Sequence, residues 1–329
     1  MNSFTKRDFS DTEIELMVRS ILGDSAEIQH TTPLTAGWFN TAYAIKFASP
    51  HPYMVLRIAP DSRLRMLQYE KDLMRLEVIA YQLLQDKDSE VYVPDLYGYN
   101  FDRTVVPHDF MLISEMLGFP YGSRTLNDQN DPYDRYDVYM EDLGQNIAQL
   151  RKITNDWFGL LDGKFRSGSW RTTFLAMIGS VLEDGESFKV MLPYAEMRDL
   201  IAAAAPALDE IMTPTLVHWD LWGGNVFVQD VSIHGHVNVM GIIDWERAFW
   251  GDRAMESMLP CVEGNNAIWA GLGESMEIGA TAEIRRSLYR LYLQLVMVVE
   301  DKVRFGGADH LEKTNHDLHQ ELEKLAKLV

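Results

Sequence analysis

The residues best suited to chemistry stand in the stretch 216–228, LVHWDLWGGNVFV. It contains His218, then Asp220, then Asn225 five positions after the aspartate, and it ends in an apolar run typical of a strand. One loop with this spacing could aim a carboxylate at a nucleophile while placing an amide oxygen on a metal ion. Magnesium prefers oxygen ligands. The stretch therefore predicts a loop that combines a general base with a magnesium ligand.

A second acidic residue fits the same site. Asp244 directly follows the apolar run 241–243, and a predicted hairpin separates Asp244 from Asn225. Protein kinases have the same order, in which a loop aspartate accepts the substrate hydroxyl proton and an asparagine and a later aspartate hold the magnesium ions on the nucleotide phosphates. Any one aspartate could simply cap a turn, but the joint spacing with His218 and Asp220 favours the functional interpretation.

Upstream residues could hold the nucleotide. The turn-rich stretch 35–40 stands before a strand and contains Gly37, so we expect it to cover the nucleotide phosphates. Arg57 stands where a kinase places its phosphate-pairing lysine, and arginine can act there as a permanently charged bidentate donor. Glu77 could form the supporting ion pair with Arg57. Glu70 lies two turns earlier on nearly the same helical face and remains the alternative.

The elements that must position these residues can be predicted from periodicity. Period-2 patterns predict strands and 3.6-residue patterns predict helices. We expect strands at 41–47, 53–58 and 110–115, a hairpin over 226–244 with its turn around His234 and His236, and helices at 11–22, 63–85, 140–150, 172–182 and 195–211, with two more closing the chain, the first stopped by Gly306 and Gly307. A connector rich in Gly and Pro at 116–122 divides the two halves. The pattern predicts an α+β, bilobal, protein-kinase-like fold with a small nucleotide-binding β/α lobe (1–116) and a larger, mainly helical catalytic and acceptor-binding lobe (117–329).

Composition limits the function further. The chain has 329 residues, which favours two lobes because single cores stop growing near ~250–300 residues. Its formal net charge of −19 argues against nucleic acid as a partner, since that binding needs a basic face. An acidic surface could attract a cationic substrate, although it could equally serve solubility alone. Cys261 is the single cysteine, and the sequence shows neither a signal peptide nor an apolar run of membrane-spanning length. We therefore expect a cytoplasmic protein.

The motifs together resemble the aminoglycoside phosphotransferase family, which shares its kinase-like fold with choline kinases. The resemblance spans roughly residues 35–256 and rests on the motifs HWDLWGGN (218–225), IDWERAFWGD (243–252), VLRIAP (55–60) and ISEMLGFP (113–120). It implies that Asp220 is the catalytic base, that Asn225 and Asp244 bind Mg2+, and that His218 supports the loop. It also implies that the backbone at Glu115 and Met116 holds the nucleotide base.

Four positions depart from the family pattern. Trp219 replaces a common glycine, Arg253 stands where proline is common, Glu256 stands where an aspartate is frequent, and Arg57 replaces a lysine. None of these departures removes the base or a metal ligand. The predicted activity is therefore unaffected, whereas the identity of the substrate is not determined.

The resemblance implies a magnesium-dependent transfer of the terminal phosphate of ATP or GTP to a hydroxyl of a small molecule. An aminoglycoside-type antibiotic is our first expectation for the acceptor. Choline, a sugar, an amino acid or a macrolide are alternatives, as is a nucleotide-binding pseudoenzyme. The oligomeric state stays open.

Overall fold

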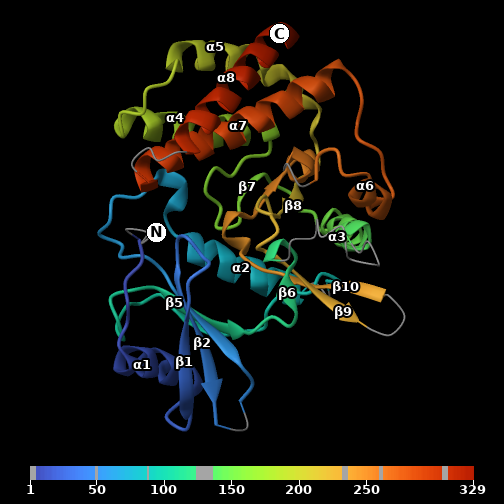
Figure 1. The fold of residues 1–329 in the computed structure, drawn as a ribbon. Helices are drawn as coiled ribbons and strands as arrows, with labels where there is room; N and C mark the ends of the chain where they lie inside the picture. The colour runs from blue at the N-terminus through green and yellow to red at the C-terminus, as the bar shows by residue number, and fades with distance from the viewer. Residues whose placement is uncertain are drawn as a thin grey trace.

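The protein divides into a sheet at its N-terminal end and a region dominated by helices (Figure 1). The computed structural model describes residues 5–48, 51–86, 89–123, 136–231, 236–258, 262–305 and 310–329. The α+β fold class expected from the sequence is confirmed, whereas the lobe boundary at residue 116 stays a prediction.

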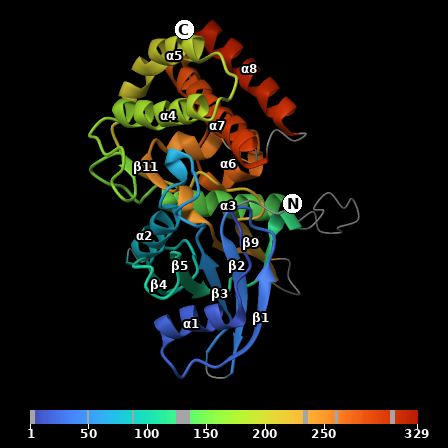
Figure 2. The ribbon, with the colours of Figure 1, turned by 90° about the vertical axis from the view of Figure 1, so that its left-hand side faces the viewer.

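The N-terminal sheet has five antiparallel strands in the order β1-β2-β3-β5-β4. They are β1 (Ile28–Leu34), β2 (Thr41–Phe47), β3 (Met54–Ile58), β4 (Leu96–Asn100) and β5 (Phe110–Ser114). Successive side chains of a strand point to opposite faces. On β5, Phe110 and Leu112 pack in a core with α1 (Asp11–Leu22), while Met111 and Ile113 join the core that includes α2 (Leu73–Asp86). The sheet therefore lies between two helices, and Figure 2 shows both beside it.

Among the described residues, the helical region contains six further helices. They are α3 (Tyr136–Leu150), α4 (Trp170–Ser187), α5 (Tyr194–Ala204), α6 (Asn266–Leu272), α7 (Ala280–Phe305) and α8 (His310–Leu328). Figures 1 and 2 show α4, α5, α7 and α8 gathered at the end of the molecule opposite α1. Trp170 anchors this group, since its indole donates to the Tyr289 hydroxyl of α7 at 2.8 Å.

No helix among the described residues has both the length and the apolar character to cross a bilayer. The cytoplasmic location stays a prediction.

Two three-stranded sheets are formed by described residues that follow β5. One has the order β10-β9-β6, from β6 (Phe119–Pro120), β9 (Val226–Val231) and β10 (His236–Ile242). The other has the order β7-β11-β8, from β7 (Gly159–Leu160), β8 (Thr215–Val217) and β11 (Phe249–Gly251). The predicted hairpin over 226–244 is confirmed by β9 and β10, although residues 232–235 of its turn, which include His234, lie outside the described residues.

One helix begins later than the periodicity predicts. The apolar pattern from residue 63 suggested a continuous helix, but a short 3-10 turn, η1 (Gln68–Glu70), comes first and α2 begins at Leu73. The break lies at Asp72, whose φ of 63° is left-handed and cannot continue a right-handed helix. The proposed helix at 195–211 likewise divides into α5 and the 3-10 segment η3 (Ala205–Glu210).

Other helix predictions hold. Residues 11–22 form α1, whose start is fixed by a capping box in which Ser10 and Glu13 bond each other's backbone N–H groups. Both closing helices are present as α7 and α8, although Gly306 and Gly307 between them lie outside the described residues. The strands β1 and β4 and the helix α6 were not predicted from the sequence.

Candidate active site

The hairpin of β9 and β10 brings two distant candidates together. Val226 pairs with Ile242 across the hairpin, and the Ile243 N–H donates to the Asn225 carbonyl at 2.9 Å. Asn225 therefore lies directly before one strand of the pair and Asp244 just after the other. Asp244 takes a left-handed φ of 67°, a conformation that aspartate tolerates better than most residues.

His218 connects the two ends of this hairpin. The imidazole Nδ1 accepts the Asp220 N–H at 3.1 Å, so its proton must sit on Nε2, which donates to the Ile243 carbonyl at 3.0 Å. The side chain is fully buried, and burial lowers the pKa of His218 to about 4. A neutral imidazole with both nitrogens in use suits a supporting role.

Asp220 and Asn225 are held in fixed relation. The Asn225 amide donates to the Asp220 carbonyl at 2.9 Å and to its Oδ2 at 3.1 Å. This arrangement commits the amide nitrogen to Asp220 and leaves the amide oxygen as the atom that could bind a metal. Burial raises the pKa of Asp220 to about 7, although the positive charge of Arg247 opposes the shift.

Arg57 lies at the centre of three carboxylates. Its guanidinium is 3.0 Å from Glu77 Oε1, 2.6 Å from Asp244 Oδ1 and 3.6 Å from Glu246 Oε2. The pairing arises because β3 supplies the arginine, α2 supplies Glu77, and α2 packs on the 3-10 turn η4 (Trp245–Arg247) that follows Asp244. Of the two glutamates that the sequence left open, Glu77 makes this ion pair.

Glu70 pairs elsewhere. Its carboxylate accepts from Arg304 Nε of α7 at 2.7 Å and from the Leu67 N–H at 2.9 Å, and it is almost completely buried. Because η1 precedes α2 and packs on α4, Glu70 points to the helical region and away from Arg57.

The pKa values of these three carboxylates are shifted from their ordinary values. Burial would raise the pKa of Asp244, but the Arg57 guanidinium outweighs it and holds that pKa below its usual value. Burial raises the pKa of Glu77 to about 7 against the opposing charge of Arg57. Burial and the neighbouring Asp244 charge raise the pKa of Glu246 to about 8. Because three carboxylates surround the Arg57 guanidinium, a further positive charge would be stabilised beside them.

Oxygen donors suited to a divalent cation are present. Oxygens of Glu77, Asp244 and Glu246 lie within 4.8 Å of one another. Among the described residues, the buried atoms Glu77 Oε2 and Asn40 Oδ1 accept no hydrogen bond, and buried acceptors of this kind are rare in proteins. An oxygen-rich set with unsatisfied acceptors fits Mg2+.

Two contributors were missed by the sequence analysis. Glu246 stands two residues after Asp244, and it accepts a 2.9 Å bond from the Asn40 amide of the loop before β2, which ties that loop to the carboxylates. Glu256 was recognised only as a departure from the family. It accepts the His218 N–H at 2.7 Å and the Trp219 N–H at 3.2 Å, and so fixes the backbone of the loop that carries Asp220. The spacing Asp-x-Glu was the signal that could have identified Glu246.

The nucleotide-binding candidates lie in two places, Glu115 and Met116 directly after β5 and Gly37 between β1 and β2. The Glu115 N–H donates to the Tyr53 carbonyl at 3.1 Å, so only its carbonyl and the Met116 N–H would be available to a nucleotide base. Gly37 lies in the exposed β1–β2 loop, and a Cβ there would meet nothing closer than the Asn40 carbonyl at 4.0 Å. Because Gly37 is not left-handed, no steric requirement for glycine is evident at that position.

Comparison with known proteins gives one family match. Residues 30–275 match the model of the phosphotransferase enzyme family. A search of curated protein sequences finds no match.

Solved structures of aminoglycoside phosphotransferases have the same fold. The structure of APH(4)-Ia is 15% identical, with 95% of this chain and 99% of that chain covered and a TM-score of 0.64. A ternary complex of a thermostable APH(4)-Ia mutant with AMP-PNP and hygromycin B is 16% identical, covering 93% and 97%, with a TM-score of 0.60. The GDP complex of aminoglycoside 2'-phosphotransferase-IIIa is 17% identical, covering 96% and 99%, with a TM-score of 0.59.

Proposed function

Because the chain belongs to the phosphotransferase enzyme family, we propose that it transfers the terminal phosphate of ATP or GTP to a hydroxyl group of a small polar molecule. The observation that carries this proposal is the arrangement of Asp220, Asn225 and Asp244 around one hairpin, with Arg57 bonded to Asp244. Family membership makes the protein a phosphotransferase, as the motifs predicted, and the arrangement supports the residue roles proposed below.

Asp220 would accept the proton of the acceptor hydroxyl as the new phosphate ester bond forms. A general base works best when its pKa lies near the working pH, and a pKa of about 7 meets that condition. The Asn225 amide fixes the carboxylate orientation, and Glu256 fixes the backbone that carries it. Catalysis here rests on positioning and electrostatics rather than on a covalent intermediate.

Asn225 and Asp244 would hold Mg2+, with Glu246 as a further oxygen ligand beside them. When bound, the ion neutralises charge on the nucleotide phosphates. Arg57 would then pair with phosphate oxygens while Glu77 keeps the guanidinium in place. Gly37 in the phosphate-covering loop, and the backbone of Glu115 and Met116, would complete the nucleotide site.

For the acceptor we propose an aminoglycoside-type molecule. Support comes from the similar fold of a structure that holds hygromycin B and from the net charge of −19, which favours encounter with a cationic compound. Both arguments concern the class of acceptor and leave its identity to experiment.

The decisive experiment replaces the base. Asp220→Asn should abolish phosphate transfer to a panel of amine-bearing antibiotics, sugars and choline, measured by coupled ADP release. Binding of magnesium-ADP, measured by calorimetry, should change little because Asp220 contacts the acceptor side. Asp199→Asn on the exposed surface of α5 serves as the matched control. Full transfer activity in Asp220→Asn would refute the mechanism, and firm nucleotide binding without turnover of any acceptor in the wild type would favour a pseudoenzyme.

A further inference from the structure

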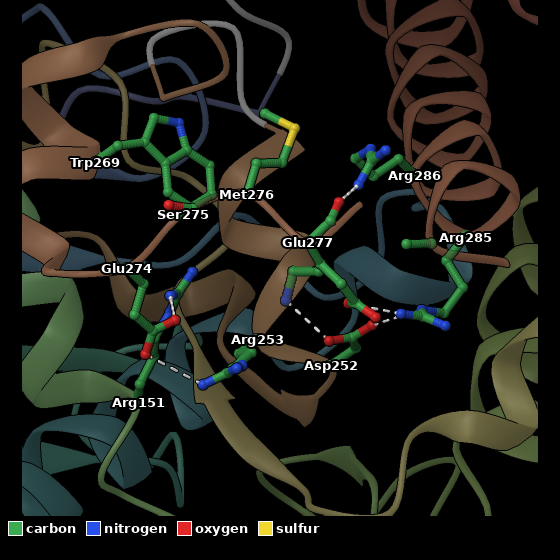
Figure 3. A pocket seen from close by; sticks show the side chains of 12 residues that line it. Arg151, Asp252, Arg253, Trp269, Glu274, Ser275, Met276, Glu277, Arg285 and Arg286 are labelled. Atoms are coloured by element: carbon green, nitrogen blue, oxygen red, sulfur yellow. Dashed lines mark hydrogen bonds and ion pairs between the residues drawn. The ribbon is translucent and has the colours of Figure 1, made fainter. Parts of the chain in front are cut away.

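A small pocket lies in the helical region, apart from the residues around Asp220 and Asp244. It has a volume of about 50 Å³ and lies between the end of α3, the turn after β11, α6 and the start of α7 (Figure 3). Its lining consists of Arg151, Asp252, Arg253, Ala254, Trp269, Glu274, Ser275, Met276, Glu277, Ala282, Arg285 and Arg286. Because a single water needs ~10–15 Å³, the space suits a group of a few non-hydrogen atoms.

The lining is rich in ion pairs. Four arginines face three carboxylates there, and Glu210 and Glu283 pair with Arg285 and Arg286 from outside the lining. Of the carboxylates, Asp252 is already used within the fold, since it accepts from the Tyr289 hydroxyl at 2.7 Å and from the Ala254 N–H at 2.9 Å. The charges of Arg285 and Arg286 are therefore balanced within the fold, whereas Arg151 and Arg253 share the single carboxylate of Glu274.

Two buried donors of the pocket have no acceptor. Trp269 Nε1 and Arg285 Nε are buried and make no hydrogen bond to any described residue. The nearest carboxylate oxygen to Arg285 Nε is Asp252 Oδ2 at 3.6 Å, which is too far for a hydrogen bond. The Arg285 side chain is only 1% exposed, so bulk water does not satisfy it. Buried donors are nearly always paired, so these two indicate an acceptor that binds from outside the chain.

One carboxylate already occupies an anion position at the rim. Glu274 lies between Arg151 and Arg253, at 2.8 Å and 3.3 Å respectively, and Figure 3 shows it bridging them. Glu274 is 40% exposed and Arg253 is 56% exposed, whereas Arg151 is only 9% exposed, so solvent reaches this carboxylate from the Arg253 side. Its release would free guanidinium donors for another anion.

We propose that this pocket binds a small oxyanion, such as a phosphate or a carboxylate group, in exchange for Glu274. The indole N–H of Trp269 and the Nε–H of Arg285 supply the unpaired donors, and Arg253 supplies charge after Glu274 has left. Guanidinium groups match the planar oxygens of a carboxylate and the oxygens of a phosphate.

The test follows the indole N–H groups of the whole protein by two-dimensional 15N NMR during titration with inorganic phosphate. The chain has 8 tryptophans, and Trp269→Phe identifies the resonance of Trp269. We expect that resonance to shift in a saturable manner, whereas sodium chloride at equal ionic strength leaves it in place. A parallel titration with acetate distinguishes a carboxylate from a phosphate as the preferred oxyanion.

Two variants give effects of opposite sign. Glu274→Gln should bind phosphate several-fold more tightly because it removes the competing carboxylate charge, and Trp269→Phe should bind several-fold more weakly because it removes one donor. Trp157→Phe, outside the pocket, is the matched control and should bind as the wild type does. A Trp269 resonance unmoved by either oxyanion, or an affinity that does not rise in Glu274→Gln, would overturn the proposal.

Discussion

Arg57 on β3 donates a 2.6 Å hydrogen bond to Asp244, although 187 positions separate the two residues along the chain. The bond joins the N-terminal sheet to the hairpin that carries the proposed metal ligands. It also places a guanidinium cation among three carboxylates, those of Glu77, Asp244 and Glu246. The stability of this group should therefore depend on Arg57 and on added divalent ions.

Arg57→Gln should destabilise the protein by about 3–5 kcal/mol, because it leaves buried carboxylates without their partner. Magnesium should restore part of that loss, so its effect on the melting temperature should be larger in the variant than in the wild type. Thermal denaturation with and without Mg2+ measures both effects. Arg57→Lys keeps the positive charge and should therefore lose less stability than Arg57→Gln. A variant as stable as the wild type in the absence of Mg2+ would contradict this prediction.

Glu70 and Arg304 form a buried ion pair between η1 and α7, with side chains 1% and 6% exposed. Glu70→Gln and Arg304→Met should each lower the free energy of unfolding by about 3–5 kcal/mol, because each leaves the other residue's charge buried and unpaired. The double variant should lose clearly less than the sum of the two. Urea denaturation of the four proteins gives the coupling energy.

The exposed pair Arg171 and Asp209, with side chains 41% and 54% exposed, provides the comparison. Its coupling should be about 0–1 kcal/mol because water screens the charges. Equal coupling energies for the two pairs would mean that burial does not strengthen the Glu70–Arg304 interaction.

Trp219 combines a strained backbone with a well-packed side chain. Its φ is 61°, and its ring stacks on Tyr292 with centroids 4.9 Å apart. Trp219→Ala should cost about 3–5 kcal/mol through lost packing. Trp219→Gly removes the same contacts but also removes the strain of the left-handed backbone conformation. The glycine variant should therefore be about 1 kcal/mol more stable than the alanine variant. Chemical denaturation compares the two, and an alanine variant more stable than glycine would argue against backbone strain.

Glu256 should make stability depend on pH. Burial raises its pKa to about 7 in the folded protein, against an ordinary value of 4.5, although the His218 and Trp219 N–H groups oppose the shift. The folded state therefore holds a proton that the unfolded state has lost between about pH 4.5 and pH 7, so this group's contribution to stability falls as pH rises through that window.

Glu256→Gln has no proton to lose and should show a smaller fall in unfolding free energy between pH 5 and pH 8, by an amount of the order of 1–3 kcal/mol. Urea denaturation at several pH values compares the variant with the wild type. Parallel pH profiles would show that Glu256 is already ionised in the folded protein.

The sequence by itself determined the local elements and the order of the motifs. Regular apolar spacing was enough to locate α1, β2, β5, α7 and α8, because that spacing reflects which face of each element is buried. The spacing of Asp220, Asn225 and Asp244 predicted a shared site, since a short hairpin must return the chain close to its start. Short strands such as β4, and the break at Asp72, carried too little periodic signal to be predicted.

Only the tertiary structure decided which charges meet. Glu70 and Glu77 lie seven positions apart and looked equivalent on a continuous helix, but the left-handed turn at Asp72 separates them. Glu77 consequently faces Arg57, and Glu70 faces Arg304, which is 234 positions away. Long-range pairing of this kind depends on how elements pack, and no local pattern encodes it. The roles of Glu246 and Glu256 became visible for the same reason, because each acts through a backbone or side chain that the fold places beside it.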